Sequence, residues 1–249
     1  QKDEDLLADE SDKAASLPMV QPSVDLVDGK TESQNLDTET VEITYKKSHN
    51  MVYREDRSHW STFLAVNSEM ILFSQYRSQF DRSSYDSTFG DRTLNTAQAE
   101  IGFKYNFSLG SIGLSGLYGK GFLRDLTKGG DERELAIEKM AGGANYYMDT
   151  FFSEPYFVPY VGAQLYKFNW RERSVARGEK TGATDFATMW TAGGLMQLNW
   201  LDPDAASKSR SEWGLTNMFL DIYASQYISE EEPDFTSDVN YGAGLRLEF

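Results

Sequence analysis

The chain has 249 residues, with 39 acidic and 24 basic side chains, a formal net charge of −15 and no cysteine. The lack of cysteine excludes a disulfide framework and a thiolate metal site, and the acidic charge argues against a nucleic-acid partner. The low mean hydropathy of −0.54 does not exclude a membrane protein, because a transmembrane strand turns only every second residue to lipid.

Residues 1–57 form the first region, which we predict to be an acidic, largely disordered extension. No aromatic residue precedes Tyr45, so the segment has too little apolar surface to offset the entropy lost on ordering. Its short apolar clusters "SLPMV" and "VDLV" leave open a role in docking on a protein partner. His49 and His59 both precede the first clear strand, and we expect them in solvent rather than on a metal ion.

Residues 58–249 form the second region, in which apolar and polar residues alternate as in β-strands. The clearest segment is "TAQAEIGFKYNFSL", where every second residue from Ala97 to Leu109 is apolar. A globular strand usually has about 5–6 residues, whereas this length suits a tilted strand that crosses a bilayer. Eight such segments are predicted, at approximately 60–73, 96–109, 112–122, 134–148, 156–168, 186–200, 213–225 and 239–249.

The connections between these segments differ in length and character. The second is only two residues long, whereas the first, the third and the fifth (169–185) are long and charged. Short turns at one end and long loops at the other are typical of outer-membrane barrels. The sixth connection, around 201–212, is longer than this pattern predicts.

The last nine residues, "YGAGLRLEF", alternate strictly up to a terminal aromatic residue. They resemble the C-terminal signature of bacterial outer-membrane barrels, and "FVPYVGAQLYKF" is similar to a strand of small OmpA-type and OmpW-type barrels. The resemblance covers about residues 60–249. It implies an all-β, up-and-down antiparallel transmembrane barrel of about eight strands, with both termini in the periplasm. It also implies an assembly signal for the barrel-assembly machinery, which comprises Tyr241, Leu245, Leu247 and Phe249.

A soluble β-sandwich or lipocalin-like barrel remains the alternative, because its strands would alternate similarly. The long strands, the many aromatic residues and the terminal Phe249 favour the membrane barrel. In that case outer-membrane lipid surrounds the wall, and lipopolysaccharide is the expected partner of the outer loops.

Inward-facing polar residues of such a barrel are expected to fill it, since eight strands leave room only for side chains. An unpaired charge in this position is costly, so we predict a paired network. The predicted lumen network comprises Glu100, Lys104, Lys139, Gln164, Asn217, Asp221 and Arg246.

The fifth connection carries a cluster of cations in an otherwise acidic chain. These residues are candidates for contacts with lipopolysaccharide phosphates. The alternative is a solvated loop in which Glu172 and Glu179 balance the charge. The cluster comprises Arg171, Arg173, Arg177 and Lys180.

No histidine falls within a predicted strand or outer loop, and no phosphate-binding loop occurs, so we predict neither an enzyme nor a cofactor. An acid/base pair of Glu132 and Glu134 at the outer rim stays open. The predicted function is a non-enzymatic structural or interaction component of the outer membrane, which docks a periplasmic or membrane partner through residues 1–57. A transporter of small hydrophobic solutes or a lipid-handling barrel is the alternative, to which inward aromatics such as Phe63 and Tyr160 would contribute.

Overall fold

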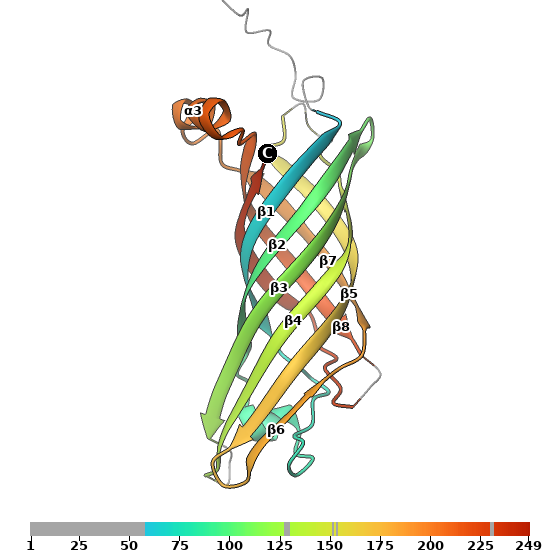
Figure 1. The fold of residues 1–249 in the computed structure, drawn as a ribbon, viewed down its shortest axis with the longest axis vertical. Helices are drawn as coiled ribbons and strands as arrows, with labels where there is room; N and C mark the ends of the chain where they lie inside the picture. Colours follow the sequence, from blue (N-terminus) through green and yellow to red (C-terminus); the bar gives the residue numbers. More distant parts are fainter. Residues whose placement is uncertain (1–57, 127–129, 151, 153, 230–231) are drawn as a thin grey trace, which may run out of the picture. The chain divides into compact units, whose positions relative to one another are not determined.

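The computed structural model describes residues 58–126, 130–150, 152, 154–229 and 232–249. The predicted extension at 1–57 and its docking role therefore lie outside the described residues. Antiparallel strands dominate the rest (Figure 1). The strands are β1 (Trp60–Ile71), β2 (Leu94–Phe107), β3 (Gly110–Leu126), β4 (Glu132–Tyr147), β5 (Phe157–Ser174), β6 (Gly178–Ala183), β7 (Ala187–Gln197), β8 (Asn217–Ile228) and β9 (Asn240–Glu248), and the helices are α2 (Tyr85–Phe89) and α3 (Pro203–Trp213).

Eight of the strands found in the described residues close into a barrel, which confirms the predicted fold class and strand number. Each pairs with its neighbours in antiparallel register, and the pairings β1–β9 and β4–β5 join the ends of the sheet. The final residue takes part in closure, since the Phe249 and Thr62 backbones exchange hydrogen bonds of 2.9 and 3.1 Å. Closure satisfies the backbone groups that an open sheet edge would expose.

Several predicted boundaries were wrong: β3 is longer than the predicted segment 112–122, and two other differences change the nature of a connection. The fifth segment was expected to end at 168, but β5 continues to Ser174 and pairs with β6, so much of the predicted loop 169–185 is a hairpin. The seventh segment was expected to begin at Trp213, but this residue ends α3. Asp202 caps the start of α3, where its side chain accepts from the Ala205 amide at 2.9 Å, and Gly214 follows in the left-handed conformation.

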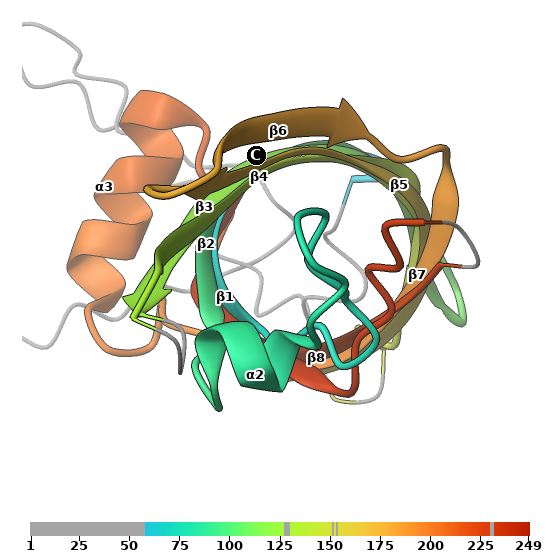
Figure 2. The same cartoon turned by 90° about the horizontal axis from the view of Figure 1, so that it is seen from below.

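The two ends of the barrel carry different connections. The C-terminus and α3 lie at one end, whereas β6 lies at the other (Figure 1). Residues 72–93 connect β1 to β2 and include α2, and Figure 2 shows this connection across the opening at the β6 end. We call residues 72–93 the lid. Neither helix in the described residues is long and apolar enough to span a bilayer.

The barrel interior holds two apolar clusters with polar residues between them. The larger cluster lies at the lid end, where Phe73 of the lid packs on Phe168 and Tyr227 of the strands, and Tyr76 and Phe89 belong to the same cluster. The smaller cluster comprises Tyr147, Val158, Tyr160, Leu195, Phe219 and Tyr223. Small inward residues make room for these rings: a Cβ on Gly242 would lie 2.2 Å from the Tyr223 ring.

Candidate functional site

The polarity of this barrel is the reverse of that of a soluble domain. Along β2, Ile101 and Phe103 point outward with exposed fractions of 63% and 64%, whereas Glu100 and Lys104 are buried inside. The same reversal runs round the wall. The exposed apolar belt comprises Leu64, Val66, Ile101, Phe103, Leu114, Met140, Val161, Leu165, Met196, Ile222 and Leu245.

Arg246 of β9 is the centre of the first group of polar residues in the lumen. Its guanidinium donates to the Tyr147 hydroxyl at 2.6 Å and lies 3.3 Å from Glu100 and 3.6 Å from Asp221. Tyr160 in turn donates to Asp221 at 2.9 Å. Two carboxylates from different strands thus face one guanidinium, which compensates their charge inside the barrel.

Two further groups centre on lysines. Lys104 donates to Glu248 at 2.7 Å, towards the α3 end of the barrel. Lys139 donates to Glu69 at 2.8 Å and to the Tyr227 hydroxyl at 2.7 Å, and that hydroxyl donates to Glu69 at 2.6 Å. Each buried lysine among the described residues therefore has a carboxylate within hydrogen-bonding distance.

A small cavity of about 20 Å³ lies between these groups. A volume of about 10–15 Å³ holds one water molecule, so the lumen has room for hydration but not for a continuous water column. Several polar atoms that lack a protein partner belong to the residues that line it. They are Asn67 Oδ1, Gln98 Oε1, Glu100 Oε1, Asn145 Oδ1, Gln164 Oε1, Thr191 Oγ1 and Arg246 Nε.

The lid is fastened to the barrel by a buried carboxylate. Glu172 of β5 accepts hydrogen bonds from the Tyr76 hydroxyl at 2.9 Å, the Ser78 hydroxyl at 2.6 Å and the Gln79 amide at 2.7 Å. Arg133 of β4 donates to the same carboxylate at 3.1 Å. One inward side chain thus binds lid backbone, lid side chains and a neighbouring strand.

Arg133 extends this contact to two more carboxylates. It lies 2.9 Å from Asp81 of the lid and 2.5 Å from Asp131. Arg177, from the β5–β6 turn, lies 3.0 Å from Asp81 as well. We call Glu172, Arg133, Asp81 and Asp131 the lid clamp. The lid end is closed by charge pairs above an aromatic cluster.

The ionisation of these groups follows from their contacts. Hydrogen bonds from Ser83, reinforced by the Arg133 guanidinium, hold the pKa of Asp81 well below its usual range. Burial acts to raise the pKa of Asp131, but hydrogen bonds from Arg133, Ser174 and the Ala176 amide outweigh it, so this pKa is also lowered. Both carboxylates therefore stay charged at neutral pH.

The structure places the predicted lumen residues inside the barrel, but it connects them only in part. Arg246, Glu100 and Asp221 meet one another, whereas Lys104 and Lys139 pair with Glu248 and Glu69, which were not predicted. The two amides of the set do not join the ion pairs. Asn217 accepts from Gln197 at 2.8 Å, and Gln164 lines the small cavity.

The predicted loop cations are divided by the structure. Arg177 and Lys180 contact the lid: Arg177 pairs with Asp81, and Lys180 donates to the Gln79 carbonyl and lies 5.3 Å from the Phe80 ring. Arg171 is on the outer wall, 3.4 Å from Glu134, and Arg173 is exposed on the same strand.

Sequence reasoning missed the strongest element of the lid clamp. Glu172 was treated as a loop charge that balances the nearby arginines. Its position in the alternation was the available signal, because Gln164, Tyr166, Phe168 and Trp170 point inward and Glu172 continues the same face. The open acid/base pair of Glu132 and Glu134 has a simpler role. Both carboxylates pair with Arg124, at 3.3 and 2.7 Å.

No family model and no curated protein matches the chain. Among solved structures it is similar to Ail of Yersinia pestis, with 10% identity, a TM-score of 0.41 and coverage of 76% of this chain and 97% of that one. It is similar to the N-terminal β-barrel domain of OprF from Pseudomonas aeruginosa, with 14% identity, a TM-score of 0.41 and coverage of 77% and 98%. It is also similar to the outer membrane protein OprG from Pseudomonas aeruginosa, with 10% identity, a TM-score of 0.44 and coverage of 76% of this chain and 95% of that one.

Proposed function

We propose that the chain is a sealed, non-enzymatic barrel of the outer membrane, where it acts as a structural or interaction component. The observation that carries this proposal is the reversed polarity of the wall. A soluble protein rarely exposes an apolar patch larger than a few hundred Å², because water disfavours it. An apolar belt around a polar, ion-paired interior is suited to lipid on the outside.

A sealed lumen supports a structural role over transport. The cavity among the ion pairs, about 20 Å³, is far smaller than a solute path requires. The aromatic cluster beneath the lid fills one end, and the Tyr147 cluster fills part of the other. The alternative, transport of a hydrophobic solute, would need displacement of the lid and of these rings.

The orientation in the membrane is part of the proposal. We place the α3 end and both termini in the periplasm and the lid outside, as in barrels whose long loops face the exterior. Tyr241, Leu245, Leu247 and Phe249 then form an outward-facing C-terminal strand for the barrel-assembly machinery. Residues 1–57 are proposed to reach a periplasmic or membrane partner.

The outer wall near the lid offers a place for lipopolysaccharide. A groove of about 1060 Å³ lies there, where Lys120 and Arg171 stand beside the exposed Phe122, each cation paired with a glutamate of β4. Cations next to apolar surface suit a phosphorylated lipid. Lipopolysaccharide that co-purifies with Arg171→Gln should fall severalfold, whereas Lys208→Gln at the opposite end should leave it unchanged; equal recovery from both would contradict the contact.

Two measurements test the sealed barrel. Protein extracted from membranes should migrate faster on a gel before boiling than after it, and reconstitution into a planar bilayer should give no steady conductance. A variant with residues 74–91 replaced by a short Gly-Ser loop is the matched control, since it keeps the strands but loses the lid. A persistent open pore in the unaltered chain would contradict the proposal.

Docking through the extension is tested separately. The full chain and a variant without residues 1–57 are cross-linked in cells and purified in parallel, with a chain of shuffled 1–57 sequence as control. The partner should be recovered only with the native extension. Equal recovery from all three would exclude docking through this segment and leave the barrel role intact.

A further inference from the structure

The connection between β7 and β8, residues 198–216, has features that the sealed barrel does not require. We call it the α3 arm. No residue of α3 is buried, yet the arm exposes Trp213, Leu201 and Trp200 by 76%, 62% and 56%. Short helices in water depend on burial of an apolar face for stability. Large exposed apolar residues at both ends of an unburied helix call for an environment other than water.

The arm is held firmly at the barrel rim. The Thr216 amide donates to the Glu248 carbonyl at 2.7 Å, the Leu198 amide donates to the Met218 carbonyl at 2.8 Å, and the Asn199 side chain donates to the Thr216 carbonyl at 3.0 Å. Figure 2 shows α3 outside the barrel wall rather than over its opening. These contacts project the helix sideways from the barrel.

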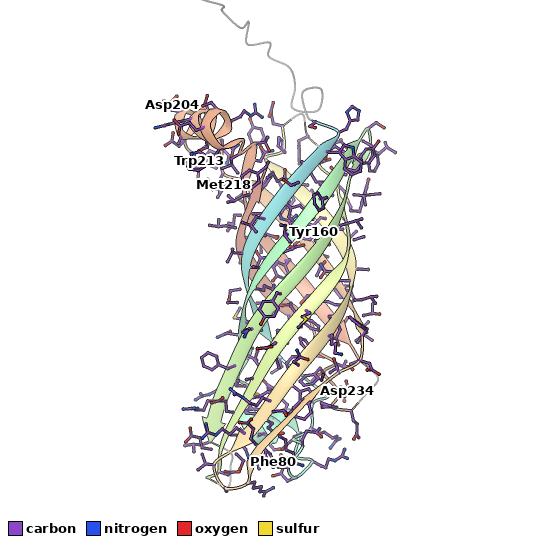
Figure 3. The ribbon with its side chains drawn as sticks, in the orientation of Figure 1. Phe80, Tyr160, Asp204, Trp213, Met218 and Asp234 are labelled. Atoms are coloured by element: carbon purple, nitrogen blue, oxygen red, sulfur yellow. The ribbon has the colours of Figure 1, made fainter. Side chains whose placement is uncertain are left out.

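The helix has two distinct sides. Consecutive residues are rotated by about 100°, so Asp204 lies about 180° from Trp213, whereas Ala206 lies within about 20° of it. Figure 3 agrees, with Trp213 on the side of α3 nearer Met218 of the barrel wall and Asp204 on the far side. Between α3 and the wall is a groove of about 200 Å³, whose lining includes Ala206 and Met218.

Aromatic side chains surround the barrel at the same end. The rings of Trp60 and Tyr105 lie tilted against each other with centres 4.8 Å apart, and the ring centres of Phe107 and Tyr146 are 6.3 Å apart. Phe249 is exposed on the same rim. Tryptophan and tyrosine gather at the membrane–water interface because one part of each ring is apolar and another is polar. The aromatic girdle therefore places α3 at the level of lipid headgroups.

We propose that the α3 arm is an interfacial anchor that lies on the leaflet at this end of the barrel and binds glycerophospholipid. Trp213, Leu201 and the groove contact acyl chains, and Arg210, about 60° round the helix from Trp213, reaches a lipid phosphate. This inference rests on the proposed membrane function, because it requires a bilayer around the wall. The occupant follows from continuity: the groove opens beside Met218 on the wall that the apolar belt covers.

The lack of cysteine in the chain allows a direct test. A spin label is attached through Ser209→Cys, about 40° from Trp213, or through Ser211→Cys, about 160° from it. The full chain is reconstituted into phosphatidylethanolamine–phosphatidylglycerol vesicles. Collision with oxygen, which concentrates in lipid, is compared with collision with a water-soluble nickel complex. We expect the ratio of oxygen to nickel accessibility to be at least about threefold higher at 209 than at 211.

A third label, at Leu114→Cys in the apolar belt, separates this inference from the proposed function. If position 114 is lipid-exposed but 209 and 211 are equally accessible to nickel, the anchor is wrong and the membrane barrel stands. If 209 is shielded from both reagents, a protein surface or the wall covers it, and the anchor is again wrong. If 114 is itself open to nickel, the proposed function fails. Replacement of Leu201 and Trp213 by Ser should raise nickel access at 209.

Discussion

The long connections at the two ends of the barrel behave in opposite ways. The lid, residues 72–93, buries Phe73, Tyr76 and Phe89 and is bound through Glu172. The α3 arm, residues 198–216, has no buried helical residue and leaves its tryptophans outside. Their lengths are similar, but their compositions differ: the lid has five aromatic residues, enough to fill a barrel mouth, whereas the arm has two.

This contrast indicates how the ends are suited to their surroundings. At the lid end, charged residues such as Arg133 and Glu172 are buried and paired with each other. Removal of one of them therefore leaves its partner buried without a counter-charge. At the α3 end, the exposed side chains make few contacts within the protein. Substitutions should therefore be costly in the lid clamp and nearly silent in the arm, unless lipid supplies the missing contacts.

The largest expected effect is at Arg133. Arg133→Met leaves the carboxylate of Glu172 buried without its cation, and loss of one partner of a buried pair costs about 3 kcal/mol. We expect the lid to detach and trypsin to cleave at Arg77 and Arg82, with a lower midpoint of urea unfolding in vesicles. Arg210→Met on α3 is the matched control and should change neither. Equal protease resistance of both variants would show that the clamp does not hold the lid.

A smaller effect is expected at Tyr76. Tyr76→Phe keeps the ring in the aromatic cluster but removes the hydroxyl that donates to Glu172 at 2.9 Å. A hydrogen bond to a charged group contributes about 1.5–3 kcal/mol. Lid cleavage should therefore accelerate between about tenfold and about a hundredfold. Tyr156→Phe, on the exposed rim at the other end, should leave the rate unchanged, and a Tyr76 variant as resistant as the parent would contradict the role of Glu172.

Acid should loosen the lid. The pKa values of Asp81 and Asp131 are lowered in the folded chain, so their contribution to stability is present at neutral pH. It falls as the pH drops below about 4, the ordinary pKa of Asp, because the unfolded chain then binds protons that the paired native carboxylates do not. Trypsin does not act there, so pepsin cleavage between pH 2 and 5 is the measurement. Asp81→Asn should make the rate of pepsin cleavage depend less on pH. An unchanged pH dependence would exclude the Asp81 carboxylate as a cause of the acid effect.

The strands of the barrel were predictable from sequence because alternation alone decides which face of a strand meets lipid. In β2, the apolar residues Ile101 and Phe103 point outward, and the charged residues Glu100 and Lys104 point inward, as the alternation predicted. The same rule placed Arg246 and Asp221 in the lumen. It did not give their partners, because which strands face each other across the lumen depends on the shear and tilt of the closed sheet.

The lid clamp and α3 were not predictable by this rule for two different reasons. Glu172 and Arg133 follow the alternation. However, charged residues point both inward and outward near the end of β5, so this part of the strand had the composition of a loop. The α3 helix had visible signals: Asp202 as its N-cap, Pro203 as its first residue and Gly214 after its end. These capping residues indicate a helix and not a strand, so the alternation of apolar and polar residues does not reveal them.

The smallest expected effect tests the arm itself. Asp202→Ala removes the carboxylate that accepts from the Ala205 amide at 2.9 Å, and loss of such a cap costs about 1 kcal/mol. Because α3 buries nothing, this cost should stay within the arm and leave the midpoint of barrel unfolding unchanged. Hydrogen exchange of the amides of 205–213 should accelerate in detergent and much less in vesicles, if lipid stabilises the helix. Equal acceleration in both would show that the arm gains nothing from the membrane surface. The cap of α2 is the matched control: Ser84→Ala should have the same effect in either medium, since α2 packs on the barrel through Tyr85 and Phe89.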